Sequence, residues 1–77
     1  MSNIEIIYDA LNNKKTVFLY DDYEQVVIKL IPVEDGNTKA FAKRKGRKEY
    51  SLEANTKVVY NAELGGQIVD QEFYDSF

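Results

Sequence analysis

Apolar residues near the start of the chain recur at the spacing of one helix face. They occupy positions i, i+3, i+4 and i+7, and they are Ile4, Ile7, Tyr8 and Leu11. This period predicts an amphipathic helix over residues 1–13. Ser2 and Glu5 have the spacing of a capping box, in which each side chain accepts a hydrogen bond from the other residue's backbone amide. A helix of about three turns is too short to be stable alone, so we expect it to pack on a neighbouring layer.

From residue 15 to residue 69, turn residues separate short segments that are rich in β-branched and aromatic side chains. This alternation is typical of β-strands. We expect strands at residues 16–20, 24–31, 39–43, 49–52, 57–60 and 67–69. The Asp35-Gly36 pair predicts a tight turn before the third strand. Gly46 suits a positive φ at the turn that follows it.

These elements predict a single small α+β domain over residues 1–77. An N-terminal helix packs on five or six antiparallel strands, which form an SH3-like or Sm-like barrel or a strongly bent sheet. Closing a barrel removes the exposed sheet edges through which small β-proteins aggregate. The alternative is an open antiparallel sheet with the helix on one face. Residues 70–77 follow the sheet as an acidic and aromatic tail.

The composition limits the chemistry that the chain can perform. None of its 77 residues is cysteine or histidine, so the commonest metal ligands and the usual acid or base at neutral pH are missing. The glycines form no phosphate-binding motif. We therefore expect a protein that is not an enzyme and that has no cofactor and no bound metal. Its apolar stretches are too short to span a bilayer, and we expect a cytoplasmic protein.

Positive charge is concentrated at one predicted hairpin tip, in a chain whose net charge is −3. The cationic residues of this basic hairpin are Lys43, Arg44, Lys45, Arg47 and Lys48. Such a cluster can bind phosphates or an acidic partner. Phe41 and Tyr50 flank it and can stack on nucleic-acid bases. The alternative is a solvated tip whose charges keep a sheet edge soluble.

The last eight residues interleave carboxylates with aromatic rings. They include Asp70, Glu72, Phe73, Tyr74, Asp75 and Phe77. This pattern predicts a docking surface that imitates a nucleic-acid backbone or fills a basic groove, where aromatic anchors dominate binding. Alternatively, the rings pack over an open barrel end and add to a small core. We expect the compact fold to hold this acidic surface apart from the basic hairpin.

One ordered pattern resembles a known family. A helix, a pair of lysines and an apolar strand ending in tyrosine precede an Ile-Pro step, a basic strand and a Tyr-Ser-Leu segment. The residues are Ile7, Ala10, Leu11, Lys14, Lys15, Val17, Phe18, Leu19, Tyr20, Ile31, Pro32, Ala40, Phe41, Ala42, Lys43, Arg47, Tyr50, Ser51 and Leu52. Over residues 4–60 this order resembles the WYL domain, an Sm-like barrel module of bacterial and phage regulators, although the Trp-Tyr-Leu triplet is absent. The resemblance implies a module that senses a ligand or a nucleic acid and is not an enzyme.

The sequence therefore predicts a non-catalytic binding module. The kind of protein that we expect is a small bacterial or phage accessory protein that regulates a larger protein partner. Two alternatives stay open, namely a nucleic-acid binder that uses the hairpin 43–48 and an acidic inhibitor that mimics nucleic acid. Exposed sheet edges also make a homodimer possible.

Overall fold

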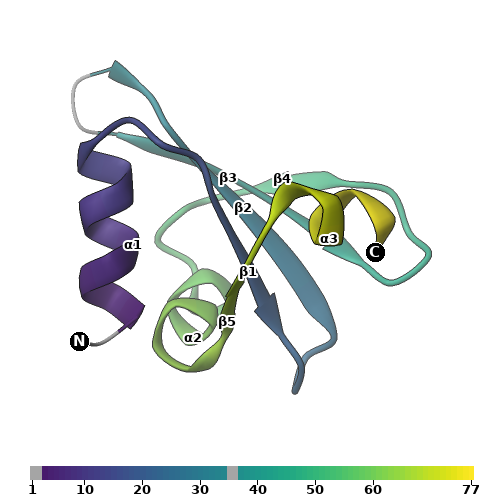
Figure 1. The fold of residues 1–77 in the computed structure, drawn as a ribbon. Helices are drawn as coiled ribbons and strands as arrows, with labels where there is room; N and C mark the ends of the chain where they lie inside the picture. Colours follow the sequence, from purple (N-terminus) through teal and green to yellow (C-terminus); the bar gives the residue numbers. More distant parts are fainter. Residues whose placement is uncertain (1–2, 35–36) are drawn as a thin grey trace.

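The structure, a computed structural model, describes residues 3–34 and 37–77, which form three helices and five strands (Figure 1). In chain order they are α1 (Asn3–Asn12), β1 (Val17–Asp21), β2 (Val26–Pro32), β3 (Thr38–Arg44), β4 (Tyr50–Leu52), α2 (Lys57–Gly65), β5 (Gln67–Val69) and α3 (Gln71–Ser76). Ser2 of the expected capping box and the expected Asp35-Gly36 turn lie outside the described residues. None of the helices in the described ranges has the length and apolar character needed to cross a membrane.

The five strands form one antiparallel sheet in the order β4-β3-β2-β1-β5. The predicted α+β class, N-terminal helix and antiparallel sheet are confirmed. The sheet is not closed into a barrel, so the SH3-like or Sm-like barrel is not confirmed and the open-sheet alternative describes the fold. Its edge strands, β4 and β5, have three residues each, and the chain between them forms a helix. No ladder therefore joins the two edges among the described residues.

One face of the sheet carries the main hydrophobic core. Leu19 of β1 stands opposite Ile28 of β2, and alternate residues along each strand point to this same face. Ile7 of α1 and Val59 of α2 pack onto them, and both are almost completely buried. Figure 1 shows α1 and α2 together on this side of the sheet.

The opposite face of the sheet is covered by α3, which contacts β1 and β2. Phe18 of β1 and Val27 of β2 point to this face because they alternate with the core residues. The ring centroid of Tyr74 lies 5.4 Å from that of Phe18, and only 2% of Tyr74 is exposed. Residues 70–77 are therefore a packed helical segment in which Asp70 caps α3 by accepting a bond from a backbone amide.

The segment 57–60, predicted as a strand, begins helix α2 instead, so that prediction is wrong. The buried side chains of α2 have the i, i+3, i+4 spacing of one helix face, and they are Val59, Ala62 and Glu63. This face packs against α1 and β1. Its burial outweighs the modest strand preference of the two valines and the tyrosine that suggested a strand.

Gly66 connects α2 to β5 at a point of close backbone approach. Its N–H donates to Ala62 O at 2.8 Å, and its carbonyl accepts from Asn3 Nδ2 at 2.7 Å. A Cβ atom at this position would lie 2.6 Å from Ala62 O and 2.9 Å from Tyr20 O, which are both backbone atoms. Only glycine fits without a shift of the neighbouring backbone. The contacts of Gly66 join α1, α2 and the sheet.

Candidate functional site

The basic hairpin lies at the β3–β4 connection, as predicted. Gly46 at its tip has a φ of 73°, a left-handed conformation that glycine adopts without strain. Lys45, Arg47 and Lys48 are exposed, and no ion pair to them occurs in the described part of the chain. These three cations are free to meet a ligand.

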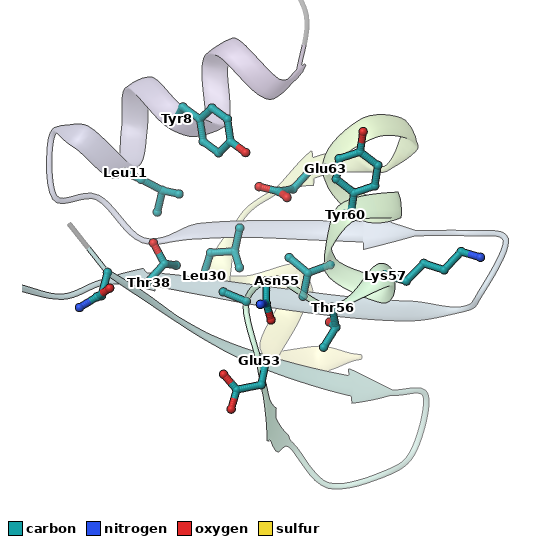
Figure 2. A pocket seen from close by; sticks show the side chains of 13 residues that line it. Tyr8, Leu11, Leu30, Thr38, Glu53, Asn55, Thr56, Lys57, Tyr60 and Glu63 are labelled. Carbon is teal, nitrogen blue, oxygen red and sulfur yellow. The ribbon is translucent and has the colours of Figure 1, made fainter.

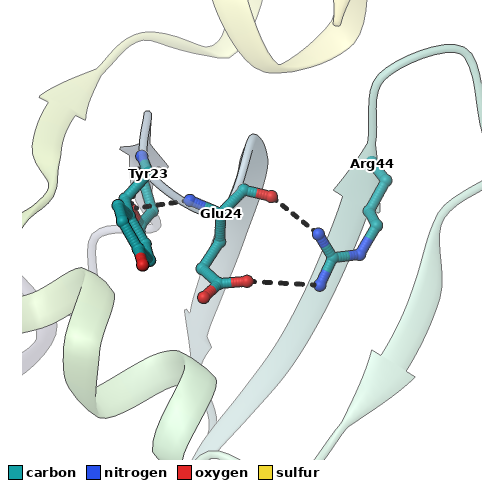
Figure 3. Close-up of polar contacts among 4 residues, drawn as sticks. Tyr23, Glu24 and Arg44 are labelled. Atoms are coloured by element: carbon teal, nitrogen blue, oxygen red, sulfur yellow. Dashed lines mark hydrogen bonds and ion pairs between the residues drawn. The ribbon is translucent and has the colours of Figure 1, made fainter.

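Arg44 is engaged with the neighbouring β1–β2 turn (Figure 3). Its guanidinium donates to Glu24 O at 2.6 Å and lies 4.0 Å from Glu24 Oε2. In the same turn, Asp21 accepts hydrogen bonds from the backbone amides of Tyr23 at 3.0 Å and Glu24 at 3.3 Å. Arg44 thus fastens the turn to β3 and is less free than its neighbours to bind phosphate.

The basic hairpin and the C-terminal segment adjoin each other, so the expected separation of the two surfaces is wrong. Lys43 Nζ donates to Asp75 O at 3.1 Å and lies 5.0 Å from the centroid of the Tyr74 ring. At the hairpin tip, the Gly46 N–H donates to Phe77 O at 3.3 Å. The cause is the docking of α3 on the sheet, which brings the last residues of the chain alongside the hairpin.

Phe41 and Tyr50, predicted as stacking residues, lie on opposite faces of the sheet. Across β3 and β4, Tyr50 pairs with Ala42 and Phe41 pairs with Ser51. Paired residues share a face and successive residues alternate. Phe41 is half-buried beneath Lys29, whose Nζ lies 5.1 Å from the ring centroid. The two rings therefore do not form one platform for bases.

The aromatic residues of the C-terminal segment pack against the sheet. The ring centroids of Phe73 and Phe77 lie 5.1 Å and 5.4 Å from that of Tyr20. This packing supports the alternative in which the segment adds to the core. Glu72 and Asp75 stay exposed, so the acidic groups are accessible, while of the expected anchors Tyr74 is buried and Phe73 keeps 38% of its surface exposed.

The Glu49 cluster, made of Glu49, Lys29 and Tyr74, lies between the sheet and α3. The Tyr74 hydroxyl donates to Glu49 Oε2 at 2.5 Å, and Lys29 Nζ lies 3.0 Å from the same oxygen. The tyrosine first, and then the lysine, hold the pKa of Glu49 below its ordinary value although burial opposes them. Burial and the bond to Glu49 raise the pKa of Tyr74. Each charged group of this cluster has a partner, so the cluster stabilises α3 on the sheet.

A groove of about 740 Å³ opens between α1, α2 and the ends of β2 and β3 (Figure 2). We call it the α1–α2 groove. Its floor is apolar, and its lining includes Tyr8, Leu11, Leu30, Thr38, Tyr60 and Glu63. The volume is in the range of sites that hold small molecules or short chain segments. None of its lining residues belongs to the basic hairpin or to the C-terminal segment.

Glu63 extends into this groove between Tyr8 and Tyr60 (Figure 2). Only 8% of Glu63 is exposed, and its carboxylate has no hydrogen bond or ion pair within residues 3–34 and 37–77. Burial raises the pKa of Glu63 above its ordinary value, because water that would stabilise the charge is excluded. Tyr8 and Tyr60 are 49% and 55% exposed. The mouth of the groove is therefore open and aromatic.

Thr56, elsewhere in the lining of the groove, carries a buried polar atom without a partner in the described part of the chain. Its Oγ1 is buried and has no hydrogen-bond partner among the described residues. Thr56 is the N-cap residue of α2, where a threonine hydroxyl ordinarily accepts a bond from a helix amide, but that bond is not made. Buried polar groups without a partner are uncommon in native structures, and this one lies beneath the groove surface, out of reach of a ligand.

The α1–α2 groove was not predicted from the sequence, because residues 57–60 were expected to form a strand. A usable signal was the helical spacing of Val59, Ala62 and Glu63, which puts a carboxylate on an otherwise apolar helix face. The basic hairpin and the C-terminal segment were found because their charges are contiguous in the chain.

Comparisons with protein-family models, curated proteins and solved structures found no match to this chain. The resemblance to the WYL domain therefore stays an expectation. Among the described residues, no three acidic side chains are arranged to hold a metal ion. The α1–α2 groove offers binding chemistry, because it combines one desolvated carboxylate, two accessible aromatic rings and an apolar floor.

Proposed function

We propose that this protein is a non-catalytic binding module that regulates a larger protein partner, and that the partner binds in the α1–α2 groove. One observation carries the proposal. Glu63 is almost fully buried and has no partner in the described ranges, yet it extends into an open groove between two accessible tyrosines.

A carboxylate in this position opposes folding. Burial removes part of the water that solvates the charge and supplies no donor in its place, which is a cost to folding, and the net stability of so small a domain is only several kcal/mol. An uncharged side chain at position 63 would remove this cost. A bound partner that donates to the carboxylate would also remove it, which is why local violations of folding rules are expected at functional sites.

The test begins with capture of the tagged full chain from its host and purification of the protein that is retained. Calorimetry then compares the affinity of this partner for the unaltered chain, for Tyr60→Ala and for Tyr23→Ala. Tyr23 is the matched control, because it is 89% exposed in the β1–β2 turn and outside the groove.

We expect Tyr60→Ala to weaken binding roughly tenfold or more, as for an aromatic interface anchor, and Tyr23→Ala to leave it unchanged. Equal affinities of all three proteins for the partner would overturn the proposal. Circular dichroism confirms that both variants are folded, which we expect because both side chains are largely exposed.

Nucleic-acid binding is a second candidate, favoured by the exposure of Lys45, Arg47 and Lys48 without ion pairs in the described chain. The joint replacement of these three by alanine is the sharpest test, because Lys43 and Arg44 are engaged within the molecule. Affinity for a single-stranded oligonucleotide should fall steeply with salt, and the triple variant should flatten that dependence. Failure to bind at low salt would exclude this candidate.

Two further expectations from the sequence stay proposals. An acidic inhibitor would act through exposed carboxylates such as Glu72 and Asp75, without the packed aromatic rings as anchors. A homodimer would pair the edge strands β4 or β5, whose outer backbone groups have no strand neighbour among the described residues.

A further inference from the structure

The mouth of the α1–α2 groove has the chemistry of a cation site. We propose that the groove binds a basic segment of the partner, with the head group of a lysine or arginine on the Glu63 carboxylate and its aliphatic stem between Tyr8 and Tyr60. This inference rests on the proposed function and adds the chemical class of the partner's contact residue.

The carboxylate and the two rings favour the same type of ligand. An ammonium or guanidinium group supplies the hydrogen-bond donors that Glu63 lacks. The faces of tyrosine rings attract the same cations and pack against a methylene chain. Among the described residues, no lysine or arginine forms an ion pair with Glu63. Lys57 also lines the groove, but Figure 2 shows its side chain running away from the carboxylate.

A second carboxylate adds to the negative character of the groove. Glu53 lines the groove well away from Glu63 in Figure 2. The two carboxylates are not gathered into a group of metal ligands within the described residues. Separate carboxylates along one groove suit an elongated basic ligand better than a single compact ion.

The length of the groove points to a chain segment and not to a free amine. The two carboxylates of the lining, Glu53 and Glu63, lie apart along the groove in Figure 2. A peptide can place one side chain on Glu63 while the rest of its chain runs toward Glu53. An adjoining hollow of about 790 Å³ shares Tyr8, Leu11 and Thr38 with the groove, which extends the surface along α1.

The test uses two acetylated and amidated pentapeptides, each with two alanines on either side of a central residue. The central residue is lysine in one peptide and norleucine in the other. Norleucine keeps the aliphatic stem and removes the charge. Titration of the isotope-labelled full chain is followed by amide chemical shifts. We expect the lysine peptide to shift the resonances of Tyr8, Tyr60 and Glu63, and to bind roughly tenfold more tightly than the norleucine peptide.

Variants assign the effect to the carboxylate. Glu63→Gln keeps the shape of the side chain and should reduce the affinity for the lysine peptide roughly tenfold, to that of the norleucine peptide. Glu72→Gln makes the same chemical change on α3, outside the groove, and should leave the affinity unchanged. Equal affinity for the two peptides would overturn the inference, and so would unchanged binding by Glu63→Gln.

The purified partner separates failure of this inference from failure of the proposed function. If Tyr60→Ala loses the partner while Glu63→Gln binds it fully, the groove is the site but the cation contact is wrong. If neither change affects the partner, the proposed function is itself overturned. Loss of the partner in both variants, together with selective binding of the lysine peptide, supports both.

Discussion

Glu49 and Glu63 are carboxylates on opposite sides of one small sheet, and their surroundings differ in the supply of hydrogen-bond donors. Glu49 accepts from the Tyr74 hydroxyl at 2.5 Å and lies 3.0 Å from Lys29 Nζ. Glu63 is more deeply buried and has no donor among the described residues. The pKa of Glu49 is lowered by its partners, whereas the pKa of Glu63 is raised by burial.

This difference distinguishes a structural cluster from a candidate binding site. On the α3 side, charge is neutralised within the chain, and the polar groups hold a helix that is too short to be stable alone. On the groove side, the Glu63 carboxylate has no donor among the described residues, so a bound molecule can supply one. Substitutions that break the contacts on each side test this contrast.

The largest effect should come from truncating Tyr74. Tyr74→Ala removes a buried ring from contact with Phe18 and leaves Glu49 without its hydroxyl donor. We expect a loss of about 3–4 kcal/mol in the free energy of unfolding, as for other buried aromatic residues. Urea denaturation measures it. Tyr23→Ala, at a position that is 89% exposed, should cost less than about 0.5 kcal/mol, and similar losses for the two would show that α3 is not packed as described.

A smaller effect should follow from adding a methyl group at Gly66, which holds the wall of the groove to the sheet. Gly66→Ala would place Cβ against Ala62 O and Tyr20 O and should cost about 2 kcal/mol. Gly65→Ala is the matched control, because a Cβ there meets nothing within 4 Å. It should be neutral or stabilising by about 0.5–1 kcal/mol. Thermal unfolding compares the two variants, and a Gly66→Ala protein as stable as Gly65→Ala would contradict the close approach.

Neutralising the two carboxylates should change stability in opposite directions at pH 7. Glu63→Gln removes an unpaired charge and should stabilise by about 0.5–1 kcal/mol, since water in the open groove already screens part of the cost. Glu49→Gln weakens contacts with Tyr74 and Lys29 and should destabilise by about 0.5–1 kcal/mol. Denaturant midpoints measure both. Destabilisation by both substitutions would remove the contrast between the two sites.

The pH dependence of these differences should also have opposite signs. Because folding raises the pKa of Glu63, its contribution to stability is most favourable below its ordinary pKa of 4.5 and declines as pH rises through the folded value. Because folding lowers the pKa of Glu49, its contribution is present above 4.5 and is lost as pH falls. Both variants should therefore approach the stability of the unaltered chain in acid. Denaturation from pH 3 to pH 7 measures this, and a Glu63→Gln advantage that is constant with pH would contradict the burial of a charge.

The elements set by local pattern were predicted well. The i, i+3, i+4 spacing of Ile4, Ile7 and Tyr8 places α1 at residues 3–12, and the predicted strands at 16–20 and 67–69 correspond to β1 and β5. The segment 57–60 was wrongly predicted as a strand, because valine and tyrosine favour strands locally while α2 is stabilised by contacts with α1 and β1.

The candidate sites show the same limit. The charge of the basic hairpin can be read from the sequence. The contacts of Arg44 with Glu24 and of Lys43 with α3 depend on how separate segments pack. The α1–α2 groove joins Tyr8 to Glu63, and 54 residues lie between them in the chain. No local pattern signals that proximity.

Periodicity and composition were sufficient for the α+β class, for most element positions and for the lack of histidine and cysteine chemistry. Whether the sheet closes, which face each helix covers and which carboxylate finds a donor depended on contacts between distant segments. The physical reason is that side-chain periodicity and helical contacts involve only a few neighbouring residues. The donors that reach Glu49 and the burial of Glu63 are properties of the whole packed molecule.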